Sequence, residues 1–280
     1  MAMGVDIAGL QLILLAKKTH GLDLSDVATL GRQMIYFSPK QLQRVAHLGL
    51  PVKAESYAEE LLRALGAANL TSLDASDYEG ADVIVDFNKP LPLTLAGSFS
   101  TYIDFGSMEH IFDVRQVILN INHILREHGT ALILTICDGQ AGHGFYQYSP
   151  EFFYTVFSEA NGFANTNVYL IDADAYRYWY KVDPPSALGR RVMTPVAPLL
   201  IACVTTKRHG VGDITAVQSD YANCYWRGLD ERKPTKKLGK LAARWAVLSR
   251  YAGLFGPLVG RERRFHAAAK IIDIRAMIGI

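Results

Sequence analysis

Three acidic residues, Asp74, Asp86 and Asp104, each follow a short apolar or β-branched stretch. Such stretches predict strands, so the three carboxylates are expected at successive strand ends. In open α/β sheets, ligands bind beyond the carboxyl ends of the strands, and an acid after the second strand can hold both hydroxyls of a ribose. Aspartate is also a common turn former. Three in consecutive order nevertheless favour a ligand site over three unrelated turns.

The third strand end, residues 99–110, carries the most chemistry. It continues from Asp104 into Gly106, Ser107, Glu109 and His110. A glycine allows close approach of the backbone to a ligand. An imidazole has an unperturbed pKa near 6.5 and can take a proton from an alcohol as a new bond forms. We therefore expect His110 to be a candidate base and Glu109 to orient a base.

A second candidate base, His143, lies between two glycines in residues 142–144. Both histidines have plainer interpretations. His110 would cap or pack the first turn of a helix, and His143 would be a solvated loop residue. Tyr146 and Tyr148 follow closely. We expect them either to line an acceptor pocket or to pack in the hydrophobic core.

The first predicted strand, residues 26–30, is followed by a single glycine, Gly31. A pyrophosphate-binding turn needs a Gly-x-Gly-x-x-Gly pattern, which argues against NAD or FAD here. A nucleoside ligand without phosphates needs fewer backbone donors and fewer glycines.

Strand and helix patterns alternate along the chain, which predicts parallel βαβ units in a doubly wound sheet. The last two predicted strands, residues 167–171 and 199–205, lack a helix of ordinary size between them and are expected to be an antiparallel edge pair. The fold class is therefore α/β, with a mostly parallel sheet and an antiparallel last strand. Helices are expected at residues 7–18, 38–47, 55–65, 114–126 and 149–160.

Charge divides the chain of 280 residues. Residues 1–206 carry 14 Lys and Arg against 21 Asp and Glu, whereas residues 207–280 carry 15 against 6. We expect an N-terminal helix over 1–24, a main domain over 25–206 and a basic, mainly helical extension over 207–280. Three partners are considered for this basic segment: the acidic domain of the same chain, a second copy of the chain, and an anionic membrane surface. The first two are favoured, and nucleic acid is not expected.

The cysteines Cys137, Cys203 and Cys224 match no metal-binding spacing, so no metal is expected. Their odd number argues against a disulfide framework and fits a reducing compartment. No stretch reaches the length of a transmembrane helix, and no secretory signal is evident. We therefore expect a cytoplasmic protein, with contact at the inner membrane surface as an alternative for the basic extension.

Residues 25–206 resemble the class I S-adenosylmethionine-dependent methyltransferases, and three segments resemble a bacterial branch of that family: 72–80, 103–112 and 142–152. The resemblance implies a seven-stranded sheet whose last strand is antiparallel. It implies S-adenosyl-L-methionine as the cofactor and methyl transfer to a small molecule. Members of that branch often act on sugars, so an oxygen of a saccharide or similar small acceptor is the expected target.

The resemblance also assigns cofactor-binding roles. Gly31 would lie against the methionine part and Asp74 would hold the ribose. Asp86 and Phe87 would meet the adenine. The sulfonium side would be lined by a short run of residues: Asp104, Phe105, Gly106 and Ser107.

The family usually has an acid and two or three glycines at the first turn, where this chain has only Gly31. The alternative function is therefore a methyltransferase fold that has lost catalysis and serves as a binding scaffold.

Overall fold

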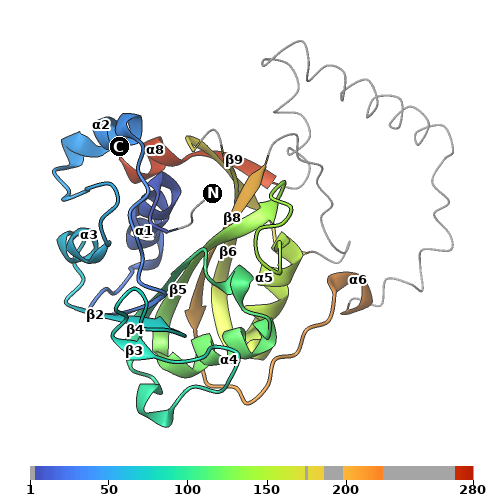
Figure 1. Cartoon of the computed structure of the whole chain (residues 1–280). Coiled ribbons are helices and arrows are strands. Elements are labelled where there is room, and N and C mark those ends of the chain that lie inside the picture. Colours follow the sequence, from blue (N-terminus) through green and yellow to red (C-terminus); the bar gives the residue numbers. More distant parts are fainter. Residues whose placement is uncertain (1–3, 174–175, 186–197, 223–268, 280) are drawn as a thin grey trace, which may run out of the picture.

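The computed structural model describes residues 4–173, 176–185, 198–222 and 269–279. Within these residues the chain forms one twisted, nine-stranded sheet with helices on both faces (Figure 1). The strands are β1 Asp26–Leu30, β2 Asn69–Asp74, β3 Val83–Ile84, β4 Phe99–Phe105, β5 Leu125–Asp138, β6 Phe163–Asp172, β7 Tyr178–Val182, β8 Leu199–Lys207 and β9 Ala269–Asp273. The α-helices are α1 Ile7–His20, α2 Pro39–Val45, α3 Glu59–Ala64, α4 Val114–Ile124, α5 Pro150–Val156, α6 Ser219–Ala222 and α8 Ile274–Ile278. The 3-10 turns are η1 Ala46–Leu48, η2 Leu93–Leu95, η3 Met108–His110 and η4 Glu159–Asn161.

The strand order is β3-β2-β1-β4-β5-β8-β6-β7-β9. Strands β1 to β5 pair in parallel, and β8 is antiparallel to both of its neighbours, β5 and β6. The chain leaves β1 toward β2 and later returns to place β4 on the other side of β1. The predicted doubly wound arrangement with an antiparallel β8 is thus confirmed. The expected count of seven strands is wrong, because β7 and β9 extend the sheet beyond β6.

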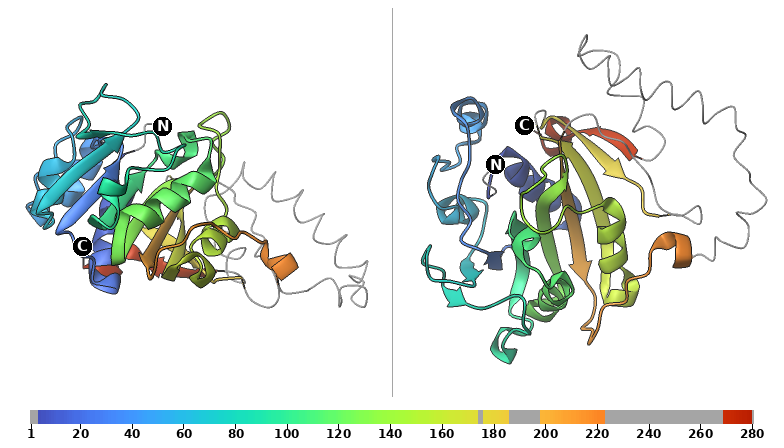
Figure 2. Two further views of the ribbon diagram at one scale, coloured as in Figure 1. Left: turned by 90° about the horizontal axis from the view of Figure 1, so that it is seen from below. Right: turned by 45° about the vertical axis from the view of Figure 1, so that its right-hand side comes forward.

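Each face of the sheet has its own hydrophobic core, as expected for a sheet covered on both sides. Along β5, Leu132 and Leu134 point to one face, with α1 and α3, whereas Ala131 and Ile133 point to the other, with α4 and α5. Figure 2 shows helices on both sides of the sheet. The two cores fix the sheet between the helices, so the strand ends form a rigid edge on which side chains can be positioned.

The described end of the chain returns to the main sheet. Strand β9 pairs with β7, and the following helix α8 packs against α1. The predicted helical extension falls mainly on residues 223–268, which lie outside the described residues. Within the described part, residues 269–278 contribute an edge strand and a short helix. None of the helices described here is both long and apolar enough to cross a membrane.

Candidate functional site

The carboxyl ends of β1, β2 and β4 bring three of the predicted cofactor residues together. Gly31, which follows β1, has a φ of +70°, a conformation that favours glycine. A Cβ at this position would lie 3.3 Å from Ser107 Oγ and 3.7 Å from Asp74 Oδ2. Gly31 therefore occupies a narrow space between the ends of β2 and β4, where a side chain would be crowded and where the strand order changes direction.

Asp74 presents one oxygen to this space. Its Oδ1 accepts a hydrogen bond from the Ser76 backbone N–H at 3.0 Å. Its Oδ2 has no hydrogen-bond donor among the described residues, so it is available to a ligand hydroxyl.

The turn after β1 is held by the chain's own side chains. Gln33 Nε2 and Ser107 Oγ both donate to the Leu30 carbonyl, at 2.6 and 3.0 Å, and the Thr29 hydroxyl donates to the Gly31 carbonyl at 2.8 Å. The Gly31 N–H is itself used, because it donates to the Leu73 carbonyl at 2.7 Å. The turn is therefore rigid and has few groups left for a ligand.

The Asp104 carboxyl links this turn to a second group of side chains. It is fully buried, and its Oδ1 accepts the Ser107 N–H at 2.9 Å while its Oδ2 accepts the Tyr102 hydroxyl at 3.3 Å. Burial, together with the negative charge of nearby Glu109, raises the pKa of Asp104 to about 8. The Asp104 carboxyl is therefore mostly protonated at neutral pH and below.

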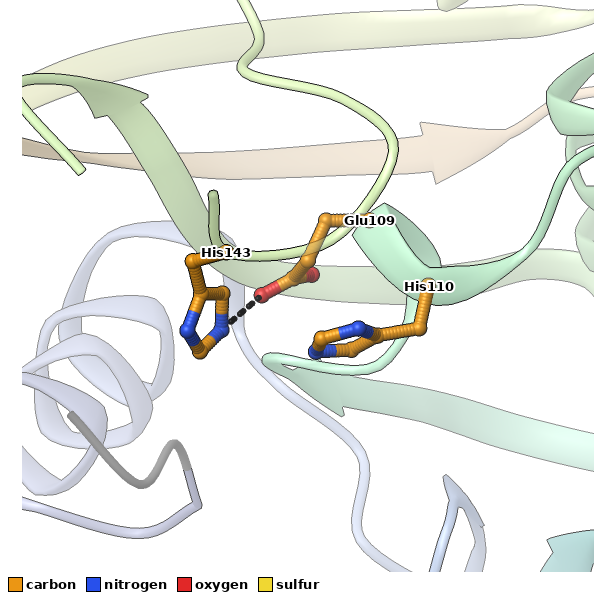
Figure 3. A group of neighbouring side chains, drawn as sticks. All are labelled: Glu109, His110 and His143. Carbon is orange, nitrogen blue, oxygen red and sulfur yellow. Dashed lines mark ion pairs between the residues drawn. The ribbon is translucent and has the colours of Figure 1, made fainter. Parts of the chain in front are cut away.

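The second group contains Glu109, His110 and His143, which the sequence predicted as catalytic candidates (Figure 3). Their ligand atoms all lie within 4.8 Å of one another. Glu109 Oε1 is 3.8 Å from His143 Nε2, and the two imidazole rings are 4.9 Å apart between centroids. The fold therefore brings His143 beside Glu109 and His110, which are neighbours in the sequence at the end of β4.

Glu109 is placed by the short turn η3, directly after β4. The side chain is completely buried, and its Oε2 accepts a hydrogen bond from the Thr135 hydroxyl of β5 at 2.8 Å. Burial raises the pKa of Glu109, and the Thr135 hydrogen bond and the neighbouring His143 partly oppose that rise. Among the described residues, Oε1 has no hydrogen-bond partner and faces the two histidines.

His143 is placed by a loop that is fastened to the backbone of Glu109. The Phe145 and Tyr146 N–H groups both donate to the Glu109 carbonyl, at 2.7 and 3.3 Å. Gly144 has a φ of +71°, and a Cβ there would lie 2.7 Å from the same carbonyl oxygen. The glycine therefore allows the loop to approach Glu109 closely and brings His143 beside it.

The two tyrosines of this loop pack and hold the loop in place. The Tyr148 hydroxyl donates to the Met108 carbonyl at 3.2 Å, and the Tyr146 hydroxyl donates to the Phe112 carbonyl at 2.7 Å. The exposed rings near the histidines are instead Phe112 and Phe145, which form an edge-to-face pair with centroids 5.7 Å apart.

Three predicted cofactor residues are engaged in other contacts or buried in the cores. The Asp86 carboxylate accepts hydrogen bonds from Asn88 and pairs with Lys89, its side chain being 40% exposed. The rings of Phe87 and Phe105 are buried in the two cores, 2% and 1% exposed. Because both rings are buried, neither has a face open to an adenine or a sulfonium. Gly106, with a φ of +93°, turns the chain between Phe105 and η3.

Two residues that shape this site were not predicted. Thr135 is the single hydroxyl-bearing residue near the end of the otherwise apolar run 131–136, a signal for a buried hydrogen-bond donor. The second residue, Gly144, stands out in the sequence only as a neighbour of His143. Its requirement for glycine follows from contact with Glu109, which is 35 positions away in the sequence and has no local signature.

No protein-family model matches the sequence, and no curated protein matches it significantly. Solved structures with a partly similar arrangement include a 1,6-didemethyltoxoflavin-N1-methyltransferase of Burkholderia thailandensis, at 13% identity and TM-score 0.37 over 72% of this chain and 80% of that one. Another is the YcgJ protein of Bacillus subtilis, at 12% identity and TM-score 0.37 over 72% and 100%. A third is a branched-chain polyamine synthase of Thermus thermophilus, at 15% identity and TM-score 0.39 over 76% and 58%. Similarity at this level does not identify the activity of this chain.

Proposed function

We propose that this protein is an S-adenosylmethionine-dependent methyltransferase that acts on an oxygen of a small acceptor such as a saccharide. The observation that carries the proposal is the edge formed by β1, β2, β4 and β5. One end of that edge holds Gly31, Asp74 and Ser107, and the other holds the Glu109 group. The antiparallel β8 between β5 and β6 agrees with the sheet that the sequence resemblance implies.

The residues around Gly31 fit a nucleoside cofactor. The absence of a Cβ at Gly31 lets the backbone lie close to Ser107 and Asp74, and Asp74 Oδ2 is available to accept from a ribose hydroxyl. When bound, S-adenosylmethionine supplies a methyl carbon on a positively charged sulfur, which is open to displacement by an oxygen. The protein's own task is then to align the acceptor and to remove its proton.

The histidine pair performs that task. The ring nitrogen of His110 or His143 accepts the proton as the acceptor oxygen bonds to carbon. Glu109 lies beside His143 and stabilises the imidazolium that this transfer creates. The exposed Phe112 and Phe145 rings provide apolar faces against which a sugar ring can stack.

Calorimetric titration with S-adenosylhomocysteine tests the proposal. We expect binding to the intact protein, and we expect Asp74→Ala to weaken it at least about 10-fold, as loss of hydrogen bonds to a charged group implies. Asp77→Ala is the matched control, because this exposed carboxylate lies three residues further along the same loop. Well-folded protein that shows no binding at millimolar ligand would refute the proposal.

A non-catalytic scaffold is the second candidate, and the turn after β1 favours it. Its carbonyls are already bonded to Gln33, Ser107 and Thr29, and no α-helix begins directly after the turn, since α2 starts only at Pro39. A scaffold predicts failure of the titration together with recovery of a stable complex in a pull-down.

The basic segment defines a further part of the proposal. We assign residues 25–206 to the catalytic domain and the charge of residues 207–280 to a contact with the acidic domain or a second copy. A membrane surface is the alternative. Co-sedimentation with anionic liposomes, with and without residues 223–268, tests the membrane alternative. Liposome binding that is lost with these residues supports it, and equal binding with and without them rules it out.

A further inference from the structure

The buried group at the end of β4 has two polar atoms whose hydrogen-bonding capacity is unused. Glu109 Oε1 and His143 Nε2 are both inaccessible to water, and neither has a hydrogen-bond partner among the described residues. Their separation of 3.8 Å is too long for a hydrogen bond. A buried carboxylate oxygen and a buried ring nitrogen without partners are costly, so such groups usually face a ligand.

The geometry points to a divalent transition-metal ion bound by Glu109, His110 and His143. Two histidines and one carboxylate form a ligand set typical of zinc and non-haem iron sites, which keep positions open for water or substrate. This assignment differs from the sequence-based expectation of no metal, which considered only the spacing of cysteines. The two histidines and the acid reach one point only through the fold.

The three ligand atoms lie close to the required distances. Metal–nitrogen and metal–oxygen bonds of about 2.1 Å allow two ligand atoms to be up to roughly 4.2 Å apart. All three ligand atoms lie within 4.8 Å of one another, and the Glu109–His143 separation is 3.8 Å. Binding of an ion would therefore draw the ligand atoms slightly closer together, and His110 is the exposed member of the group.

Neighbouring groups also hold two of the three ligands in position. Thr135 fixes one carboxylate oxygen of Glu109 and leaves the other directed toward the rings. The loop that carries His143 is bonded to the Glu109 backbone. A site whose ligands are oriented in advance by such partners binds metal more tightly, and loss of one such partner typically costs 10–100-fold in affinity.

A cation here would change how the acceptor loses its proton. An alcohol oxygen at an open coordination position becomes more acidic, as metal-bound water does, so its proton is released to solvent without a histidine base. This consequence rests on the proposed methyl transfer. The binding of the ion itself does not depend on it.

Metal titration of the full-length protein, after treatment with a chelator, tests the inference. We expect about one Zn²⁺ or Co²⁺ per chain, measured by calorimetry for Zn²⁺ and by visible absorption for Co²⁺. Mg²⁺ is the negative probe, because imidazole ligands suit transition metals better. Glu109→Gln and His143→Ala should each weaken Zn²⁺ binding at least about 100-fold, and Thr135→Val about 10-fold or more through the orientation of Glu109.

Two further variants separate ligation from folding. His110→Ala changes an exposed side chain, so it should preserve the fold and still weaken binding at least about 10-fold. His47→Ala removes an exposed histidine on η1 and should leave binding unchanged. Absence of Zn²⁺ binding, equal binding by all variants, or a sulfur-to-cobalt band from a cysteine ligand would each overturn the inference. Because the ion is titrated without S-adenosylhomocysteine, failure here is distinct from failure of the cofactor titration.

Discussion

Replacement of Gly144 by alanine should disconnect the His143 loop from Glu109. The loop offers a matched control, because Gly142 also has a positive φ, +87°, but nothing lies within 4 Å of a Cβ added there. Gly142→Ala therefore introduces only backbone strain. Gly144→Ala adds the same kind of strain and a Cβ 2.7 Å from the Glu109 carbonyl oxygen.

The two costs can be separated. Holding an alanine in the left-handed region costs about 1–2 kcal/mol, which is the expected loss for Gly142→Ala. Overlap with a backbone atom adds about 1–3 kcal/mol, so Gly144→Ala should lose about 2–5 kcal/mol in its docked form. If the free energy of undocking the loop is smaller than this loss, the loop detaches. The free energy of unfolding then falls only by the free energy of undocking.

Urea unfolding and amide hydrogen exchange distinguish these outcomes. The Phe145 and Tyr146 amides donate to the Glu109 carbonyl, so their protection reports directly on docking. We expect both amides to exchange faster in Gly144→Ala than in Gly142→Ala, whether or not the unfolding midpoint also falls. Equal exchange and equal stability in the two variants would show that the contact with Glu109 does not hold the loop.

Three other predictions concern the buried Asp104 carboxyl, the buried ring of Trp179 and the edge strand β9. The folded-state pKa of Asp104 is about 8, above the usual value of 3.8, so the folded protein holds this proton more tightly than the unfolded chain. The Asp104 contribution to stability is therefore greatest below about pH 4 and is lost as pH rises toward 8. Asp104→Asn keeps an acceptor for Ser107 and should flatten the wild-type decline, on the order of a few kcal/mol between pH 5 and 8 in urea unfolding; an unchanged slope would refute the assignment. Trp179→Ala removes a fully buried ring of β7 and should cost about 3–5 kcal/mol, whereas Tyr178→Ala on the exposed side of the same strand should cost far less, and similar losses would place Trp179 outside the core. A chain ending at residue 222 lacks β9 and should show a lower Tm and concentration-dependent association by sedimentation, while a chain in which only 223–268 is replaced by a flexible linker should not.

Local signals in the sequence predict much of the fold. Ser38-Pro39 and Ser149-Pro150 were expected to begin helices, and both serine hydroxyls accept the N–H three residues on, as caps do. The buried strand 99–105 was recognised from its composition and forms β4 as predicted. Each of these features depends on neighbours in the sequence, so residue types alone are enough to identify it.

Features that depend on distant partners were missed. Strand β9 is a short segment that becomes a strand only by pairing with β7, almost 90 positions earlier, and β7 itself lies in a connection that was expected to hold no strand. Edge strands of this kind depend on the available partner more than on intrinsic propensity. In the site, the positions of His110 and His143 were predicted but not their contact, and Phe87 and Phe105 were assigned to a ligand although tertiary packing buries them.

The place of β9 has a consequence for synthesis of the protein on the ribosome. Strand β7 and α1 are made before β9 and α8, which pair with β7 and pack against α1. Throughout translation of residues 183–268, the β7 edge has backbone groups without their final partner, which is the arrangement that pairs with foreign strands. The nascent chain is therefore expected to need protection from aggregation until residues 269–273 emerge and pair with β7.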